Sequence, residues 1–122
     1  MDISNKSYSI RIRNANNSEQ IWDFDFENDI IIGRYENCHI RLSDKSVSRQ
    51  HCRIYFNEGF IIENLSNTNK TKLNGSPVET QFMLSDNDSI ICGRETLIVD
   101  SITCVDSKAD ENTHSGTVYI YV

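Results

Sequence analysis

Apolar and polar residues alternate in short runs along most of the first hundred positions, and polar turns separate the runs. Alternation with a period of two is typical of a strand with one buried face, and short continuous apolar runs indicate fully buried strands. The expected strands are residues 8–13, 21–26, 30–32, 38–42, 51–56, 60–64, 71–73, 77–79, 82–84, 89–92 and 96–99. No stretch before residue 100 has a helical period with caps. The pattern predicts an all-β fold, a two-sheet β-sandwich of about eleven short strands.

Turn signals support this pattern at several strand ends. Asn57-Glu58-Gly59 predicts a tight hairpin, and Asn74-Gly75 is a strong signal for a two-residue hairpin turn. Gly33 ends the apolar run of residues 30–32. A glycine at that place indicates a close backbone approach or dihedral angles that a side chain would hinder.

The end of the chain follows a different pattern. Residues 106–116 are polar, acidic and loop-like, and residues 117–122 alternate like one more strand. We therefore expect a sandwich domain over residues 1–103, followed over residues 104–122 by an acidic linker and a strand-like tail. The last strand has two candidate partners, a sheet edge of its own domain or a neighbouring molecule, which would give self-association.

Charge narrows the classes of function. The net charge of −6 argues against a nucleic-acid module, which needs a basic face. No apolar run is long enough to span a membrane, and no signal peptide is visible at the N-terminus. Basic residues nevertheless concentrate between positions 33 and 53. This stretch contains five basic residues, Arg34, Arg41, Lys45, Arg49 and Arg53, and two acidic residues, Glu36 and Asp44. Such a stretch suits a small anionic target, although surface cations that happen to be neighbours would give the same pattern.

The cysteines predict an intracellular, cytoplasmic protein without a metal site. Cys38, Cys52, Cys92 and Cys104 form no C-x-x-C pair, and without a secretion signal we expect free, mostly buried thiols. The neighbours His39 and His51 raise the question of zinc. Adjacent strand residues point to opposite faces, however, so neither pair offers both side chains to one ion. No metal or other cofactor is expected.

Three polar loops after apolar runs carry candidate binding chemistry. They contribute Arg34, then Ser48 and Arg49, then Thr68 and Asn69. A phosphomonoester carries nearly two negative charges and three acceptor oxygens, so its binding needs cations, hydroxyl donors and backbone N–H groups. The amide of Asn69 has both a donor and an acceptor, which suits a peptide main chain.

In this order and spacing, the loops resemble the forkhead-associated (FHA) domain, a β-sandwich module that reads phosphothreonine peptides. The resemblance covers residues 29 to about 99, with the motifs Gly33-Arg34, Ser48-x-x-His51 and Thr68-Asn69-x-Thr71-x-x-Asn74-Gly75. It implies that Arg34, Ser48, Arg49 and Thr68 contact the phosphate and that Asn69 holds the peptide backbone. It also implies structural support from Gly33, His51, Asn74 and Gly75, with His51 bridging loops through hydrogen bonds.

The function implied by this resemblance is a regulatory or adaptor module in Ser/Thr-kinase signalling, whose partner is a phosphothreonine-containing protein. Enzyme motifs such as G-x-S-x-G, G-x-x-x-x-G-K-[ST] and H-E-x-x-H are absent, so we expect no catalysis. Thr113 in the acidic segment is a hypothetical phosphorylation site that would bind the loops in cis or in trans. The alternative function is a structural or assembly module that keeps the scaffold and leaves its phosphate site unused.

Ordinary structural roles remain open for several of these residues. Arg34 is also placed to form a surface ion pair with Glu36 or Asp44, and Ser48 and Thr68 are also typical of plain turns. Lys70 stands where the family typically has glycine. If that position needs a positive φ, lysine carries a steric cost and reshapes the loop; otherwise Lys70 adds a cation near the phosphate.

Overall fold

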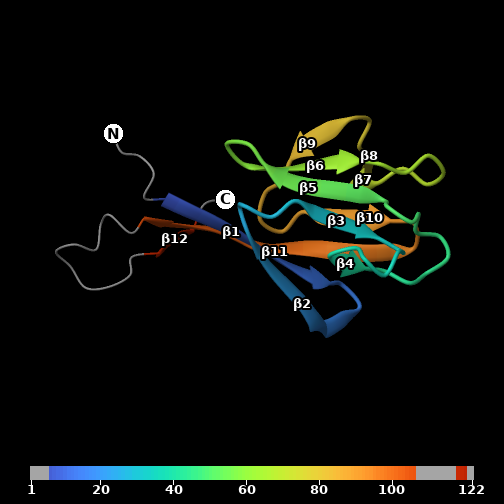
Figure 1. The fold of residues 1–122 in the computed structure, drawn as a ribbon, viewed down its shortest axis with the longest axis horizontal. Coiled ribbons are helices and arrows are strands. Elements are labelled where there is room, and N and C mark those ends of the chain that lie inside the picture. The colour runs from blue at the N-terminus through green and yellow to red at the C-terminus, as the bar shows by residue number, and fades with distance from the viewer. Residues whose placement is uncertain (1–5, 107–117, 121–122) are drawn as a thin grey trace.

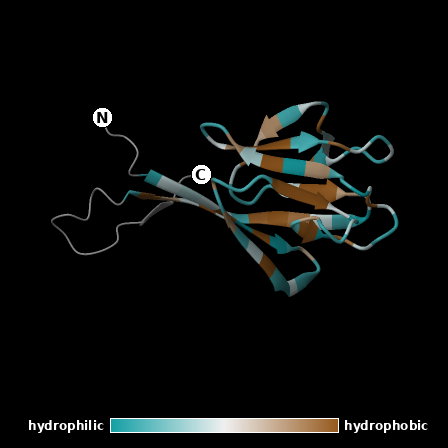
Figure 2. Cartoon of the chain, in the orientation of Figure 1, coloured by the Kyte–Doolittle hydropathy of each residue, from teal (hydrophilic) through white to brown (hydrophobic). Residues whose placement is uncertain are grey.

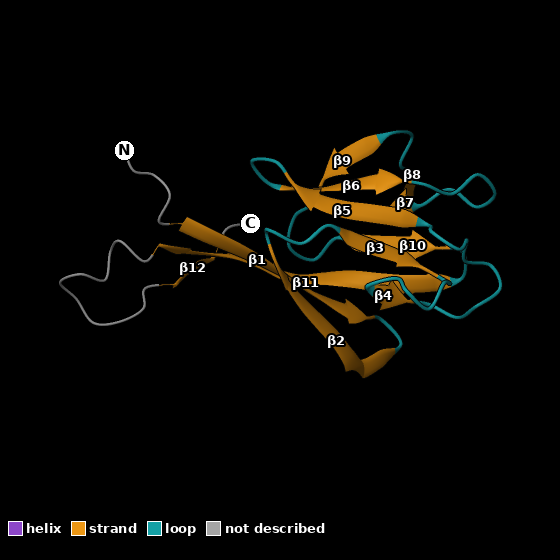
Figure 3. Cartoon of the chain, in the orientation of Figure 1, coloured by secondary structure: helices purple, strands orange, loops and turns teal. Residues whose placement is uncertain are grey.

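The computed structural model describes residues 6–106 and 118–120, and all regular elements in these ranges are strands (Figure 3). Among these residues there is accordingly no helix that could cross a membrane. The strands are β1 (Lys6–Asn14), β2 (Asn17–Asp25), β3 (Ile30–Gly33), β4 (Ile40–Arg41), β5 (Cys52–Phe56), β6 (Phe60–Asn64), β7 (Lys72–Leu73), β8 (Ser76–Pro77), β9 (Gln81–Met83), β10 (Ser89–Cys92), β11 (Glu95–Asp106) and β12 (Val118–Ile120).

Two sheets make up the fold (Figure 1). One has the order β2-β1-β11-β10-β7-β8, with β12 added beside β11, and the other has the order β4-β3-β5-β6-β9. All pairs are antiparallel except β3 and β4, which run parallel. The all-β, two-sheet prediction is confirmed.

The core lies between the sheets, and isoleucine is its commonest residue. In β5, Cys52 and Ile54 are buried, whereas Arg53 between them is only half-buried. Ile32 on β3 and Ile62 on β6 are fully buried next to them. Figure 2 shows hydrophobic residues concentrated on the strands and hydrophilic residues along the connecting loops. β-Branched side chains pack well on such pleated surfaces.

Several strands differ in length from the expectation, among them β4 and β11. The strand expected over residues 38–42 is reduced to β4, because the Cys38 N–H donates to the Tyr35 carbonyl in a turn. The strand expected over residues 96–99 runs instead to Asp106, because all of β1 pairs with the part of β11 between Leu97 and Asp106.

The C-terminal strand pairs within its own chain. Thr103 lies opposite Ile120 in the β11–β12 pairing. Thr113, Thr117 and residues 121–122 lie outside the described residues. The domain boundary expected between residues 103 and 104 falls inside β11. The division into domain and tail stays a prediction, as does self-association.

Candidate functional site

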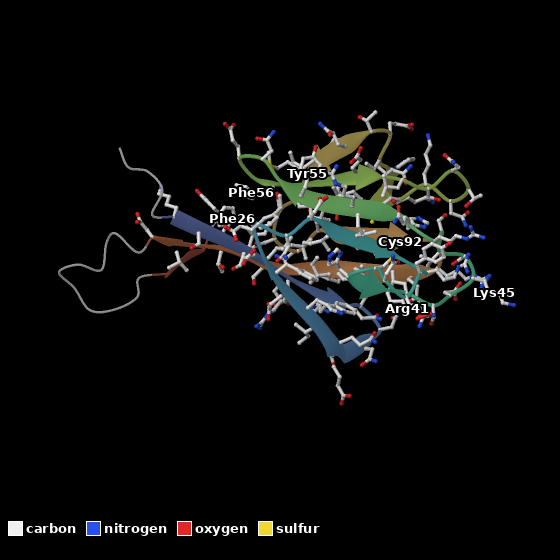
Figure 4. All side chains as sticks on the ribbon, viewed as in Figure 1. Phe26, Arg41, Lys45, Tyr55, Phe56 and Cys92 are labelled. Atoms are coloured by element: carbon white, nitrogen blue, oxygen red, sulfur yellow. The ribbon has the colours of Figure 1, made fainter. Side chains whose placement is uncertain are left out.

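Three loops meet at one end of the sandwich because β5 is antiparallel to both of its neighbours. Strand β5 therefore begins where β3 and β6 end. The loops are residues 34–39 after β3, residues 42–51 before β5, and residues 65–71 after β6. Figure 4 shows Lys45 and Arg41 at this end and Phe26 and Phe56 at the other.

The first two loops are joined through their backbones. The N–H groups of Arg34 and Tyr35 donate to the carbonyls of Ser48 (3.0 Å) and Arg49 (3.2 Å). A β-carbon at Gly33 would clash with the carbonyl of Arg49. Only a glycine therefore allows this close approach, which places Arg34 directly beside Ser48 and Arg49.

His51 fixes the backbone of the second loop at Ser48. Its side chain is fully buried, and its Nδ1 accepts the N–H of Ser48 at 2.9 Å. Burial lowers the pKa of His51, and the backbone of Asn69 opposes that shift only in part. The accepting Nδ1 assigns the proton of the neutral ring to Nε2, for which the described residues provide no hydrogen-bond partner. This hydrogen bond lies within the second loop, so the bridging role that the resemblance implies for His51 stays a prediction.

Ser66 organises the third loop, and sequence analysis did not identify its role. Its Oγ accepts the N–H groups of Thr68 (3.3 Å) and Asn69 (3.2 Å), and it lies 2.7 Å from the Oγ of Ser48. A hydroxyl oxygen has two acceptor positions and one proton. With both positions occupied, Ser66 donates its proton to Ser48, which leaves the Ser48 proton available for another acceptor.

The stem of this loop is closed by Asn64. Its Oδ1 accepts the N–H groups of Ser66 (3.3 Å) and Thr71 (3.0 Å), and its Nδ2 donates to the Ser66 carbonyl (2.9 Å). The Thr71 hydroxyl is buried and also donates to Asn64 Oδ1 at 2.9 Å. One amide therefore fixes both ends of the loop that carries Thr68.

The loops enclose a hollow of about 380 Å³, which we call the loop hollow. Its lining includes Arg34, Lys45, Ser48, Arg49, Thr68 and Asn69. None of the described residues that line it carries a carboxylate. The structure thus brings together all five residues expected to contact a ligand, together with one further cation, Lys45.

Arg34 is fixed through its Nε, which leaves the terminal amino groups of its guanidinium available to a ligand. Its Nε donates to the Val47 carbonyl at 2.8 Å, and it forms no ion pair among the residues described. Asp44 instead accepts the Ser46 hydroxyl (2.7 Å) and N–H (2.9 Å), and these two hydrogen bonds lower the pKa of its carboxyl group. The structure therefore shows neither of the surface ion pairs considered for Arg34, with Glu36 or with Asp44.

Arg49 and Thr68 complete the polar lining. The Arg49 guanidinium lies over the ring of Tyr35, 5.6 Å from its centroid, a cation–π arrangement that limits its freedom. The hydroxyls of Ser48 and Thr68 are 3.4 Å apart. Two cations and two hydroxyls therefore line one concave surface, and these are groups that suit an oxyanion.

Asn69 and Lys70 have partners of their own. Asn69 Nδ2 donates to the Ser46 carbonyl at 3.0 Å, which ties the second loop to the third. The non-glycine residues with positive φ, among those described, are Glu58, Asn74 and Asn87. Lys70 is not among them, so its side chain causes no backbone strain there. Its Nζ pairs with a carboxylate oxygen of Glu79 at 2.6 Å. Lys70 also does not line the loop hollow, so the structure shows neither a strained residue at this position nor a cation of Lys70 within the hollow.

The hairpin residues Asn74 and Gly75 lie outside the loop hollow. Both have positive φ, 53° and 89°, as a two-residue hairpin turn of this type requires. Asn74 Oδ1 accepts the Ser89 N–H at 2.9 Å, so the hairpin is fixed to the start of β10. Asn74 and Gly75 therefore hold the hairpin against β10 and do not line the loop hollow.

Comparison with known proteins decides the family. The FHA domain family matches residues 30–93, more than half of the chain. This chain belongs to the FHA domain family. The match ends at Gly93, directly after β10, and includes all three loops.

Individual FHA proteins agree with this assignment. The chain is 37% identical over 70 residues to the FHA domain-containing protein FhaA of Mycobacterium tuberculosis, of which it spans only 13%. A structure from a study of phosphothreonine-dependent FHA domain interactions aligns at 30% identity over 75% of this chain and 94% of that one, with a TM-score of 0.68. The FhaA FHA domain, crystallised in complex with the intracellular domain of Rv3910, also aligns at 30% identity, over 74% of this chain and 98% of that one, with a TM-score of 0.68.

Proposed function

We propose that this FHA domain binds phosphothreonine peptides through the loop hollow and acts as a regulatory or adaptor module in Ser/Thr-kinase signalling. The observation that carries the proposal is the lining of the hollow. Arg34, Lys45 and Arg49 face the same space as the hydroxyls of Ser48 and Thr68, and no lining carboxylate competes for the cations. In a protein with a net charge of −6, such a site favours a compact anion over a long polyanion.

Each residue has a role in the proposed complex. Arg34 offers its terminal amino groups to the phosphate oxygens, because its Nε is already held by Val47. Ser48 donates the hydroxyl proton that Ser66 leaves available, and Thr68 adds a second hydroxyl. Arg49 supplies the second charge from above the Tyr35 ring.

Asn69 is proposed to hold the peptide backbone. One of its amide protons is used on the Ser46 carbonyl, and its Oδ1 and second proton suit a main-chain N–H and C=O. The same hollow is lined by Leu65, an exposed apolar residue beside the polar groups. Contact with the threonine methyl group there would favour phosphothreonine over phosphoserine by about 1 kcal/mol.

The relatives support this role. One similar structure comes from work on phosphothreonine-dependent FHA interactions, and the FhaA FHA domain is seen with an intracellular protein domain. FHA domains are binding modules, and we propose no catalytic step for this chain. Its four cysteines are free thiols, which suits an intracellular location.

The test measures binding of a degenerate phosphothreonine peptide library by fluorescence polarisation. We expect binding that is lost with the unphosphorylated library and weakened about 100-fold by Arg34→Ala, since charge-assisted hydrogen bonds to the phosphate are lost. Arg13→Ala is the matched control, because Arg13 pairs with Asp100 on the surface of the sheet. Equal binding of the phosphorylated and unphosphorylated libraries by the folded protein would overturn the proposal, and so would unchanged affinity in Arg34→Ala.

A further inference from the structure

The sandwich formed by residues 6–106 has two edge strands in each sheet, β2 and β8 in one and β4 and β9 in the other. Strand β2 carries Glu19, Asp23 and Asp25, β4 carries Arg41, and β8 contains Pro77. Charges and prolines keep an exposed strand edge from adding a further strand. Strand β9 has the sequence Gln-Phe-Met, with neither a charge nor a proline, so it is the unprotected edge of this part of the chain.

The backbone groups of β9 point alternately toward β6 and away from the sheet. The Leu84 N–H donates to a carbonyl of β6 (2.8 Å), and the Thr80 carbonyl accepts an N–H of β6 (3.3 Å). In an antiparallel pair every second residue directs both of its groups to the same neighbour, so Phe82 also faces β6. The N–H and C=O groups of Gln81 and Met83 therefore point outward, where they can accept one more strand.

Two large apolar side chains lie on this strand. Phe82 is 53% exposed and Met83 is 52% exposed, more than the other large hydrophobic side chains of the described residues. The sulfur of Met83 lies so close to Gly59 that a β-carbon there would clash with it. Met83 thus packs along its own hairpin, and Phe82 is left at the free edge. In Figure 1, β9 forms the outer margin of its sheet.

Charge favours a second copy of this chain as the partner of β9. Two copies with a net charge of −6 repel each other, and contact through the acidic strand β2 would add to that repulsion. Strand β9 brings no ionisable side chain to a contact with its own copy. It is therefore an edge at which two acidic molecules meet without placing like charges opposite each other.

We propose that two copies of this chain associate edge to edge through β9, in antiparallel pairing about a two-fold axis at Phe82. In this register Gln81 of one copy lies opposite Met83 of the other, and their outward N–H and C=O groups exchange both hydrogen bonds. The two Phe82 residues form the non-hydrogen-bonded pair on the axis, where the side chains of neighbouring strands come closest. The edge is thus complementary to itself, as a two-fold contact requires.

The contact is small, and this sets its strength. Each copy contributes a strand of three residues, well below the roughly 800 Å² per partner of a stable interface. We therefore expect a weak dimer with a dissociation constant on the order of 0.1 mM. Antiparallel pairing turns the two copies in opposite directions, so the dimer would carry its two loop hollows at opposite ends. Each hollow remains complete in one copy, and the inference is independent of the proposed function.

Sedimentation equilibrium of the full chain measures the association. Between about 0.05 and 1 mM, the average mass should rise toward that of a dimer. The association should tighten from low to physiological salt, because salt screens the repulsion between two acidic copies. Amide hydrogen exchange over the same concentrations locates the contact: exchange at Gln81 and Met83 should slow about threefold, whereas exchange at Phe82, whose N–H faces β6, should not change.

Two variants block the edge in different ways. Phe82→Lys places a charge there, and Met83→Pro removes an outward N–H that β6 does not use, without changing Phe82. Both should stay monomeric at about 1 mM. Ile21→Lys is the matched control, because Ile21 is 47% exposed on the edge strand β2 and the charge change is the same. It should dimerise as the unaltered protein does. Thermal unfolding shows that each variant is folded at the temperature of the measurement.

Three results would overturn this inference. A protein that is monomeric at about 1 mM would leave the edge to a different chain. A dimer that persists in both variants would place the contact elsewhere, for example at the C-terminal strand β12. An association that salt weakens would indicate contact between opposite charges instead of an uncharged edge. Phosphopeptide binding is not a readout of these experiments, so all three results leave the proposed function intact.

Discussion

The two ends of the sandwich are stabilised by different interactions. At the end away from the loops, aromatic rings pack on one another: Tyr8 stacks on Phe56 with centroids 4.8 Å apart, and Phe56 contacts Phe60 and Phe26 edge-on at 5.0 and 5.7 Å. At the loop end, side-chain hydrogen bonds of His51, Asn64 and Ser66 hold the backbone.

The difference separates stability from binding. Aromatic burial at one end stabilises the fold without requiring polar groups in fixed positions. The hydrogen bonds at the other end fix the loops and leave Arg34 and Arg49 without carboxylate partners among the described residues. Substitutions at the aromatic end should therefore change the free energy of unfolding, and substitutions at the loop end should change affinity more.

The largest effect on stability is expected from Phe60→Ala at the aromatic end. Phe60 is 1% exposed, and removal of a buried aromatic ring costs about 3–5 kcal/mol through lost burial and a residual cavity. Urea unfolding measures this loss. Phosphopeptide affinity of the folded fraction should remain within about twofold; a large loss of affinity at a temperature where the variant is folded would contradict the separation of the two ends.

Ser66→Ala should affect both quantities, with a smaller loss of stability. It leaves the N–H groups of Thr68 and Asn69 without their acceptor; because both residues are exposed, water replaces part of what is lost, and we expect a cost of about 1 kcal/mol. Ser48 also loses its donor, so we expect roughly tenfold weaker phosphopeptide binding. Ser76→Ala, on the exposed β7–β8 hairpin, is the control and should change neither value. Unchanged affinity in Ser66→Ala would show that Ser66 does not position the loop.

Acid should weaken the fold through His51. Burial holds its pKa in the folded state below the ordinary value of 6.5, so the unfolded chain binds more protons as the pH falls. The free energy of unfolding should therefore decrease as the pH drops from about 6.5 toward 5. Urea titrations between pH 5 and 7.5 measure the slope. The slope should flatten in His51→Asn and persist in His39→Asn; an equal slope in both variants would assign it to other groups.

The strands could be predicted from the sequence where their partners are near in the chain. Strand β6 and strand β10 occupy the expected residues, because an alternating or continuous apolar run specifies burial locally. Strand β11 extends to Asp106 because it pairs with β1, about ninety residues earlier, and no local pattern reports that pairing. The same limit explains β4, which a turn at Cys38 shortens.

The candidate site shows the same division. Arg34, Ser48 and Thr68 are recognisable because their chemistry and order are unusual together, whereas Ser46 and Ser66 read as ordinary turn residues. Their roles depend on partners 18 to 48 positions away, such as Ser48 for Ser66 and Arg94 for Ser46. The spacings Asp44-x-Ser46 and Asn64-x-Ser66 are the only local signal, since both fit side-chain-to-backbone turns.

The smallest effect is expected from Lys70→Gly, which restores the residue typical of the family. Lys70 does not have a positive φ, so glycine relieves no strain. The substitution removes an exposed ion pair with Glu79 worth about 0.5 kcal/mol and adds chain entropy to the unfolded state. Affinity for an uncharged phosphothreonine peptide should stay within about twofold of the original value.

The same variant tests whether residue 70 shapes the third loop. Lys70 does not line the loop hollow, so phosphate-dependent binding measured by fluorescence polarisation should persist in Lys70→Gly. A tenfold increase in affinity for the uncharged peptide would mean that lysine strains the loop after all, and that the position of Thr68 depends on residue 70.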